Sequence, residues 1–374
     1  MRIYLDNAAS TAPYPEVLEA MLPYLGDAYG NPSYTHETGR KARVAIEQAR
    51  KTIARLVGAA ASEIIFTSGG SEANNIFLQG IAPEVTHIIG SPLEHPSVLE
   101  TLKYLEENHN ISISWLAVEK NGKISFDSLK VALEKNPNAL VCLMHGNNEI
   151  GNLLPLNEVT SLCETYNATL FTDAVQTIGH YTIDVHKNKV LGLGASAHKF
   201  HGPKGVGFLY LKQGTKLHAI YQGGEQERSL KPGTENVAGI VGMAKALELS
   251  SARIETNRQH IALLKSTLTA QLKEIFTDIK FNGTSEDIEN SLYTILSADF
   301  PPHLQNEMLL FKLDLAGISV SAGSACASGA TKESHVLAAL GHDSQRAVVR
   351  FSFAATNTIE EINTVCATLR EIYN

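Results

Sequence analysis

Short apolar runs and helical patterns alternate between about residue 60 and residue 211. Several of these runs are continuously apolar, which is typical of strands covered on both faces. Strands that alternate with helices predict a largely parallel sheet in an α/β domain, with the active site at the carboxyl ends of the strands. The predicted strands are residues 63–68, 86–91, 111–118, 139–145, 169–174, 189–194 and 205–211, and the predicted helices between them are residues 71–82, 96–109, 127–136 and 156–167.

An amphipathic helix is predicted over residues 38–57, where apolar side chains recur at steps of four and three until Gly58 ends the pattern. Its charged side chains, Arg50 among them, are expected to form a solvated face. Residues 236–276 predict one or two long helices that connect to a second domain. The remainder mixes strand patterns with a closing helix, at residues 292–298, 317–322, 347–353 and 358–373.

The composition is that of an ordinary globular protein, with 44% hydrophobic and 19% charged residues in 374. Its net charge of −8 gives no basic excess to attract nucleic acid or an acidic membrane, so we expect neither as a direct partner. No apolar stretch approaches the roughly 20 residues that a membrane-spanning helix needs. The N-terminus has no pattern of a targeting segment.

Four cysteines, Cys142, Cys163, Cys326 and Cys366, lie far apart without a CxxC pair. This spacing argues against a structural zinc site or a disulfide framework, and free thiols fit a cytoplasmic protein. Cys326 lies in SAGSACASGA (321–330), which has little apolar side chain to bury and predicts a mobile loop. A thiol there could carry sulfur between a deep site and a surface partner, or could be a cysteine buried in a tight packing segment. The other three thiols lie in apolar patterns and are expected in the core.

The segment SAHKFHGPKG places Lys199 just after a predicted strand, where its amine could form a Schiff base with an aldehyde cofactor. Ser196 and His198 could donate hydrogen bonds to a phosphate. An ordinary surface loop is the alternative. In FTSGGSEANN, Gly70 lets the backbone approach a phosphate at a helix N-terminus, and Ser71 adds a hydroxyl donor.

Asp173 in TDAVQ follows a strongly apolar strand, where an unpaired carboxylate is costly to bury. A protonated pyridine nitrogen would be a suitable partner, and capping of the next helix is the alternative. Gln176 could reach a phenolic oxygen of the same ring. His95 in LEHPSV could stack on a flat ring and move protons, or be structural. Asn148 in MHGNNEIGN could face the phenolic oxygen or close a turn.

These motifs occur in the order seen in a known family. The chain resembles the cysteine desulfurases, class V aminotransferase-like enzymes of fold type I that use pyridoxal 5′-phosphate (PLP). The motifs are YLDNAAS, NPSYTHETGR, FTSGGSEANN, EHPSVL, MHGNNEIG, DAVQTIG, SAHKFHGPKG, GGEQERSLKPGTENVAGIVG and SAGSACASG. The resemblance runs from about residue 3 to the end. It implies a large PLP-binding α/β domain over residues 16–255, and a small α+β domain that joins residues 1–15 to residues 256–374.

The resemblance also implies a role for individual residues. Lys199 would bind PLP, His95 would stack on its ring, and Asp173 would pair with the ring nitrogen. Cys326 would accept the sulfur, without a metal in the site. The remaining roles are Gln176 and Asn148 at the phenolic oxygen, Gly70, Ser71, Ser196 and His198 at the phosphate, Thr234 reaching the phosphate from the second subunit of a homodimer, and Arg350 with Asn31 at the substrate carboxylate.

The implied reaction converts L-cysteine to L-alanine and leaves sulfur as a persulfide on Cys326, for an iron–sulfur cluster scaffold or a tRNA-thiolation relay. A selenocysteine lyase, an aminotransferase on the same scaffold or a noncatalytic binding subunit are the alternatives. The chain departs from its relatives at Lys231, where arginine is usual, and at Gly146, where valine is usual. It also has Ala354 and Ala355 where a glycine and an arginine are typical. None of these changes removes a catalytic group.

Overall fold

The computed structural model describes residues 2–322 and 334–373 of the chain. Within them, no helix is both long enough and apolar enough to cross a membrane. Cys326, the predicted sulfur acceptor, lies outside the described residues.

A seven-stranded sheet forms the centre of the larger part of the chain, in the order β2-β8-β7-β6-β5-β3-β4. β8 runs antiparallel to both of its neighbours, and the other neighbouring pairs are parallel, so the prediction of a mainly parallel sheet is confirmed. The strands are β2 (Ile64–Thr67), β3 (His87–Gly90), β4 (Ser112–Trp115), β5 (Leu140–Cys142), β6 (Thr169–Asp173), β7 (Gly192–Ser196) and β8 (Gly207–Leu211).

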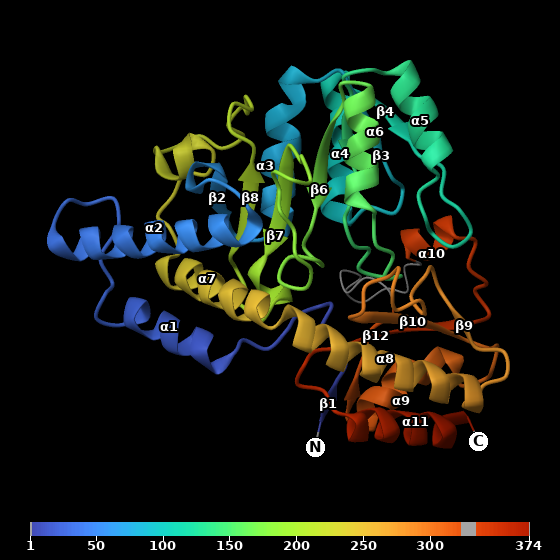
Figure 1. Ribbon diagram of the computed structural model, residues 1–374. Helices are drawn as coiled ribbons and strands as arrows, with labels where there is room; N and C mark the ends of the chain where they lie inside the picture. The colour runs from blue at the N-terminus through green and yellow to red at the C-terminus, as the bar shows by residue number, and fades with distance from the viewer. Residues whose placement is uncertain (1, 323–333, 374) are drawn as a thin grey trace.

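Helices cover both faces of this sheet (Figure 1). Successive strand residues alternate between two apolar clusters, as the pleat of a strand dictates: Ile65 packs with helices α3 and α4, and Phe66 with the helices of the other face. The flanking helices are α1 (Pro15–Leu25), α2 (Glu37–Val57), α3 (Gly70–Ile81), α4 (Pro96–His109), α5 (Phe126–Lys135), α6 (Leu156–Thr165) and α7 (Val237–Ala252).

A further apolar cluster joins Ile3 and Leu5 to residues between 261 and 369. In Figure 1, β1 accordingly lies beside the orange and red elements. The domain boundary near residue 255 stays a prediction. The sheets have the orders β12-β10-β9, antiparallel, and β1-β11, parallel. The elements are β1 (Ile3–Tyr4), α8 (Ile254–Ile275), β9 (Lys280–Phe281), β10 (Ile295–Phe300), α9 (Leu309–Leu315), β11 (Ile318–Ser319), α10 (His335–Ala339), β12 (Ala347–Ser352) and α11 (Ile359–Tyr373).

The prediction that Arg50 faces solvent is wrong. Its side chain is buried and makes two hydrogen bonds to the carboxylate of Glu227, at 2.8 and 2.7 Å. Arg50 also donates to the carbonyl of Ile64, and its guanidinium lies over the ring of Phe66. Helical periodicity places Arg50 at the border of the apolar face, but it cannot reveal a buried acidic partner far along the chain.

The cysteine predictions that can be compared with the structure are confirmed. Cys142, Cys163 and Cys366 are buried and free. Burial raises the pKa of the thiols of Cys163 and Cys366, to about 12 and about 11. These thiols therefore stay protonated near neutral pH and are not reactive groups.

Candidate active site

Loops that follow several strands of the large sheet meet at one pocket of about 260 Å³. Parallel strands bring residues distant in sequence to the same sheet edge, which explains this convergence. The pocket lies near the N-terminal segment and also receives Arg350 of β12. The predicted site residues that line it are Gly70, Ser71, His95, Asn148, Asp173, Gln176, Ser196, His198, Lys199 and Arg350. Asn31 and Thr234 are not among its lining residues within this chain.

Lys199 ends a short 3-10 turn (Ala197–Lys199) that follows β7. Its Nζ donates to the carbonyl oxygens of Ala8 and Ala9, at 2.6 and 2.9 Å. The backbone carbonyl of Lys199 accepts a hydrogen bond from Nε2 of His180 at 2.9 Å. Burial lowers the pKa of His180 to about 4, so this imidazole is neutral near pH 7. The amine of Lys199 is thus held at the pocket by the N-terminal segment.

Asp173 is the last residue of β6 and is almost fully buried. Its Oδ1 accepts from the backbone N–H of Val175 at 2.9 Å and closes a turn, and the chain continues from β6 to β7 without a helix for Asp173 to cap. Its Oδ2 accepts from the amide of Asn74 at 2.7 Å. A carboxylate oxygen offers more than one acceptor position, so the group can still receive a proton donor from the pocket.

His95 is the N-cap residue of α4, and its ring Nδ1 accepts from the backbone N–H of Ser97 at 3.1 Å. Nδ1 is also 2.8 Å from the hydroxyl oxygen of Ser97. Because Nδ1 accepts a hydrogen bond from an N–H, the proton of the neutral ring lies on Nε2. Burial lowers the pKa of His95, and the charge of Asp173 opposes this shift only in part. The ring is therefore a neutral group with a donor at Nε2.

A glycine turn and the N-terminus of α3 form one wall of the pocket. Gly69 has a φ of 155°, a conformation that side chains rarely allow. A Cβ at Gly70 would lie 2.3 Å from Cγ2 of Val175, so no larger residue fits there. Ser196 lies close to this turn, since a Cβ at Gly69 would be 3.4 Å from its Oγ. Backbone N–H groups at a helix N-terminus, with nearby hydroxyls, suit a phosphate.

His198 and Gln176 also line the pocket. Burial, with the charge of Lys199, lowers the pKa of His198 to about 4, so the ring is neutral. The amide nitrogen of Gln176 donates to the carbonyl of Ala8 at 3.0 Å. Asn148 is half-buried at the pocket, and its carbonyl accepts from Arg350 at 2.8 Å. The structure thus brings these groups together, while their individual roles remain predictions.

Arg350 is almost completely buried on β12. One of its terminal nitrogens donates to the carbonyl of Asn148, and the other donates to Oδ1 of Asp6 at 2.9 Å. Its Nε is buried and has no hydrogen-bond partner among the described residues. A buried donor without a partner is costly, so it indicates a site for an acceptor such as a substrate carboxylate.

The residues of this pocket fit PLP. The lysine amine suits the aldehyde, Asp173 suits a protonated ring nitrogen, and the glycine turn with its hydroxyl groups suits the phosphate. A metal site has no comparable basis, because the described residues contain no cluster of three or more His, Cys, Asp or Glu side chains that could hold an ion.

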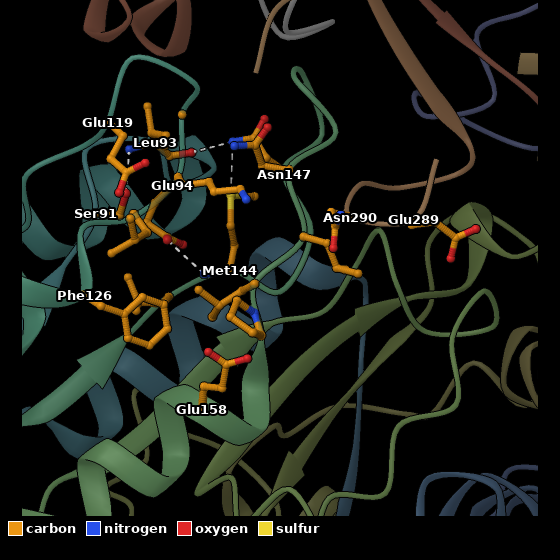
Figure 2. A pocket seen from close by; sticks show the side chains of 18 residues that line it. Ser91, Leu93, Glu94, Glu119, Phe126, Met144, Asn147, Glu158, Glu289 and Asn290 are labelled. Carbon is orange, nitrogen blue, oxygen red and sulfur yellow. Dashed lines mark hydrogen bonds between the residues drawn. The ribbon is translucent and has the colours of Figure 1, made fainter. Parts of the chain in front are cut away.

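A larger cavity of about 420 Å³ lies beside this pocket and is shown in Figure 2. Met144 lines both spaces, but the larger one contains none of the predicted site residues. In Figure 2, Glu94 accepts a hydrogen bond from the backbone N–H of Met144, at 2.9 Å. Burial, followed by the charge of Asp173, raises the pKa of Glu94 well above its ordinary value. The predicted site residues line the smaller pocket.

Three groups in contact with the site residues were not predicted from sequence. They are Asn74, which bonds Asp173; Ser97, which bonds His95; and His180, which bonds the backbone of Lys199. Both Asn74 and Ser97 occur within motifs already singled out, near the starts of helices that begin at the pocket. Their partners lie on other elements, so sequence spacing alone gave no signal for these contacts.

The glycine at position 146, where valine is usual, has a structural explanation. A Cβ at this position would lie 2.8 Å from Cγ2 of Thr177 and 2.9 Å from Cδ2 of Leu292. The neighbouring side chains therefore fill the space that the valine of relatives would need. The structure offers no comparable reason for Lys231.

Comparison with known proteins shows the family of this chain. The family model of the class-V aminotransferases matches residues 3–365. The cysteine desulfurase IscS of Dictyoglomus turgidum is 41% identical over 376 residues, which cover 99% of this chain and 94% of that protein. A putative cysteine desulfurase, IscS 1 of Bacillus subtilis, is 40% identical over 378 residues, which cover 99% and 98% of the two chains.

Solved structures show the same fold. A NifS-like protein superposes with a TM-score of 0.90 at 35% identity, over 100% of this chain and 99% of the other. A NifS-like protein from Rickettsia africae has a TM-score of 0.89 at 28% identity, over the same shares of the two chains. The chain therefore belongs to the class-V aminotransferase family.

Proposed function

We propose that this protein is a PLP-dependent cysteine desulfurase, which converts L-cysteine to L-alanine and leaves the sulfur on Cys326. One observation carries the proposal: a single pocket contains Lys199, Asp173, His95 and the buried, partly unpaired guanidinium of Arg350. The names of the relatives at about 40% identity support the choice of cysteine as substrate. They disfavour a selenocysteine lyase, and the intact lysine pocket disfavours a noncatalytic subunit.

Lys199 would hold the cofactor covalently, with Asp173 at its ring nitrogen and the turn at Gly69 and Gly70 around its phosphate. When bound, PLP withdraws electrons from the substrate Cα and so lowers the cost of removing its proton. Asp173 keeps the ring nitrogen protonated, since its carboxylate favours the positive charge. Ser71, Ser196 and His198 add donors for the phosphate, and we propose that Thr234 joins them from a second subunit.

Arg350, which lines the pocket, would bind the substrate carboxylate through its guanidinium, and we propose that Asn31 assists it. The planar guanidinium fixes the direction of the carboxylate as well as its charge. This orientation places the amino acid between the small and the large part of the chain. Gln176 and Asn148 would face the phenolic oxygen of the cofactor.

Lys199 would then act as the base that takes the Cα proton and later returns a proton to the product. His95, with its proton on Nε2, acts as a donor rather than a base in the observed state, because Nδ1 is already engaged by Ser97. The Cys326 thiolate attacks the sulfur of the substrate: an S–S bond forms and the C–S bond breaks. The bonding electrons go to the substrate carbon, which takes up a proton and leaves as alanine, so cysteine and one thiol give alanine and one persulfide.

The persulfide sulfur would pass to an acceptor protein, such as an iron–sulfur scaffold or a thiolation relay. We also propose that the enzyme works as a homodimer in the cytoplasm. Gel filtration with light scattering measures the oligomeric state, and a monomer that is fully active would contradict the role of Thr234 across subunits.

The test is to incubate the purified protein with L-cysteine and PLP and to measure alanine and sulfide together. We expect equal amounts of both in the presence of a reductant, and mass spectrometry should find an added sulfur on Cys326 without it. Cys326→Ala should keep the yellow cofactor but form no sulfide, whereas Lys199→Ala should lose the covalently bound cofactor.

Cys163→Ala is the matched control, because this thiol is buried away from the pocket. It should form alanine at the rate of the unchanged protein. Sulfide release by the Cys326→Ala variant at the unchanged rate would refute the proposed sulfur transfer.

A further inference from the structure

Asp173 and His95 lie at the ends of different strands, yet a chain of hydrogen bonds connects them. The amide nitrogen of Asn74 donates to Oδ2 of Asp173 at 2.7 Å and to the hydroxyl oxygen of Ser97 at 2.9 Å. The hydroxyl of Ser97 is 2.8 Å from Nδ1 of His95. Two side chains outside the predicted site therefore link its two central groups.

The direction of each bond follows from the chemistry of the donors. The amide of Asn74 must turn its NH₂ group toward Asp173, because the opposite orientation would place two oxygens together. Both amide hydrogens are then used, and the hydroxyl of Ser97 accepts one of them. Ser97 can therefore donate its own hydrogen only onward, to Nδ1 of His95, which also accepts from the backbone N–H of Ser97.

The packing around Asn74 preserves this orientation. Asn74 is fully buried, and its Oδ1 has no hydrogen-bond partner among the described residues. A Cβ at Gly194 would lie 2.5 Å from this oxygen, so the neighbouring strand provides room for it only because it has a glycine there. An unpaired buried oxygen destabilises the fold. The unpaired Oδ1 is explained because the amide nitrogen of Asn74 must face Asp173 and Ser97 to donate a hydrogen to each.

We propose that Asn74 and Ser97 are positioning residues that hold Asp173 and His95 as one unit and keep the proton of His95 on Nε2. The effect of these two residues on catalysis rests on the proposed function. The structural content of the inference, the bond directions and the tautomer, can be measured without any reaction. Asp173 and His95 would thus keep a fixed separation from each other.

The test uses the full-length chain with ¹⁵N-labelled histidine and reads the ring nitrogens of His95 by NMR at pH 8. A His95→Gln variant identifies the signals. We expect an unprotonated Nδ1 and a protonated Nε2. Ser97→Ala should move the Nδ1 signal, Ser97→Thr should restore it because the hydroxyl is kept, and Asn74→Leu should move it as Ser97→Ala does.

The same variants are then assayed with cysteine. We expect Asn74→Leu and Ser97→Ala to lower kcat roughly 10- to 100-fold, the scale of a small misplacement of catalytic groups, with little change in KM. Asn75→Ala is the matched control, because Asn75 is an asparagine of the same helix whose amide nitrogen bonds only the backbone carbonyls of Ser71 and, at 3.5 Å, Ser97, and neither Asp173 nor the Ser97 hydroxyl. It should leave both the NMR signals and kcat unchanged.

A protonated Nδ1 in the unchanged protein would overturn the inference. The inference would also fail if Asn75→Ala changed the Nδ1 signal of His95 and kcat as Asn74→Leu does, or if Ser97→Thr did not restore the Nδ1 signal. If the NMR shifts are as expected but the protein forms no alanine from cysteine, the proposed function is refuted and the inferred hydrogen-bond chain stands.

Discussion

Lys265 is a fully buried lysine on α8, far from the proposed chemistry. Its Nζ donates to the hydroxyl oxygen of Ser291 and to the carbonyl of Leu292, both at 2.8 Å. Burial lowers the pKa of Lys265 to about 7, and the charge of Asp287 opposes this shift only in part. The folded chain therefore releases this proton at a lower pH than the unfolded chain does.

This difference predicts how stability depends on pH. Above pH 7 the unfolded chain still holds the proton that folded Lys265 has lost, so the free energy of unfolding rises with pH up to the ordinary lysine pKa. Lys265→Met should remove a slope of roughly 1.4 kcal/mol per pH unit between pH 7.5 and 9.5, measured by urea unfolding. Lys273→Met, an exposed lysine on the same helix, should keep the slope. Equal slopes in the unchanged protein and in Lys265→Met would refute this account.

At the scale of single residues, the sequence predicts groups whose chemistry stands out. A lysine after a strand and an aspartate at the end of an apolar strand could be recognised, and the structure places Lys199 and Asp173 in one pocket. Asn74 and Ser97 could not be recognised, because an asparagine or a serine near the start of a helix is ordinary. Their importance comes from partners that only the folded chain brings near.

At the scale of elements, long amphipathic patterns were predicted well and short or irregular segments were not. Helix α4 matches its predicted range of residues 96–109, and α2 ends at Gly58, which has the left-handed conformation expected of a terminating glycine. Strand β7 begins at Gly192 rather than at residue 189, because Lys189 adopts a φ of 52° in a turn. Helix α1 was not predicted, since Pro23 interrupts its pattern.

The contact between Arg50 and Glu227 ties three elements together. Arg50 lies on α2, and Glu227 belongs to a 3-10 segment (Gln226–Ser229) far along the chain. Glu227 also accepts from the backbone N–H of Phe66, on β2, at 2.7 Å. Both charges are buried, so the loss of one partner leaves the other without compensation.

Glu227→Gln should therefore lower the free energy of unfolding by about 3–5 kcal/mol, because it removes the buried counter-charge of Arg50 and leaves only the half-exposed carboxylate of Glu47. Urea unfolding measures the change. The control is Glu47→Gln, which removes the half-exposed partner of Arg50 and should cost less than about 1 kcal/mol. The account fails if the two variants are equally stable.

At the scale of the whole molecule, the pocket lies between parts of the chain that pack into different apolar clusters. Lys199 and Asp173 belong to the large sheet, while Arg350 belongs to β12 and packs with the small part. The N-terminal segment supplies the acceptors for Lys199 and also Asp6, which binds Arg350. The sequence predicted these groups through family resemblance, but their meeting depends on tertiary contacts that no local pattern contains.

This arrangement makes Arg350 the group through which the small part recognises the substrate. Arg350→Lys keeps a positive charge but loses the planar fork that bonds Asp6 and the carbonyl of Asn148. We expect KM for cysteine to rise roughly 10- to 100-fold, the scale of one or two hydrogen bonds to a charged group, while kcat changes little.

Arg346→Lys is the control, because this buried arginine bonds Asp278 and Asp299 instead of lining the pocket. It should lower the stability and leave KM unchanged. Since a loosened small domain would affect both variants, equal KM values for the two would show that Arg350 supports the fold and does not bind the substrate.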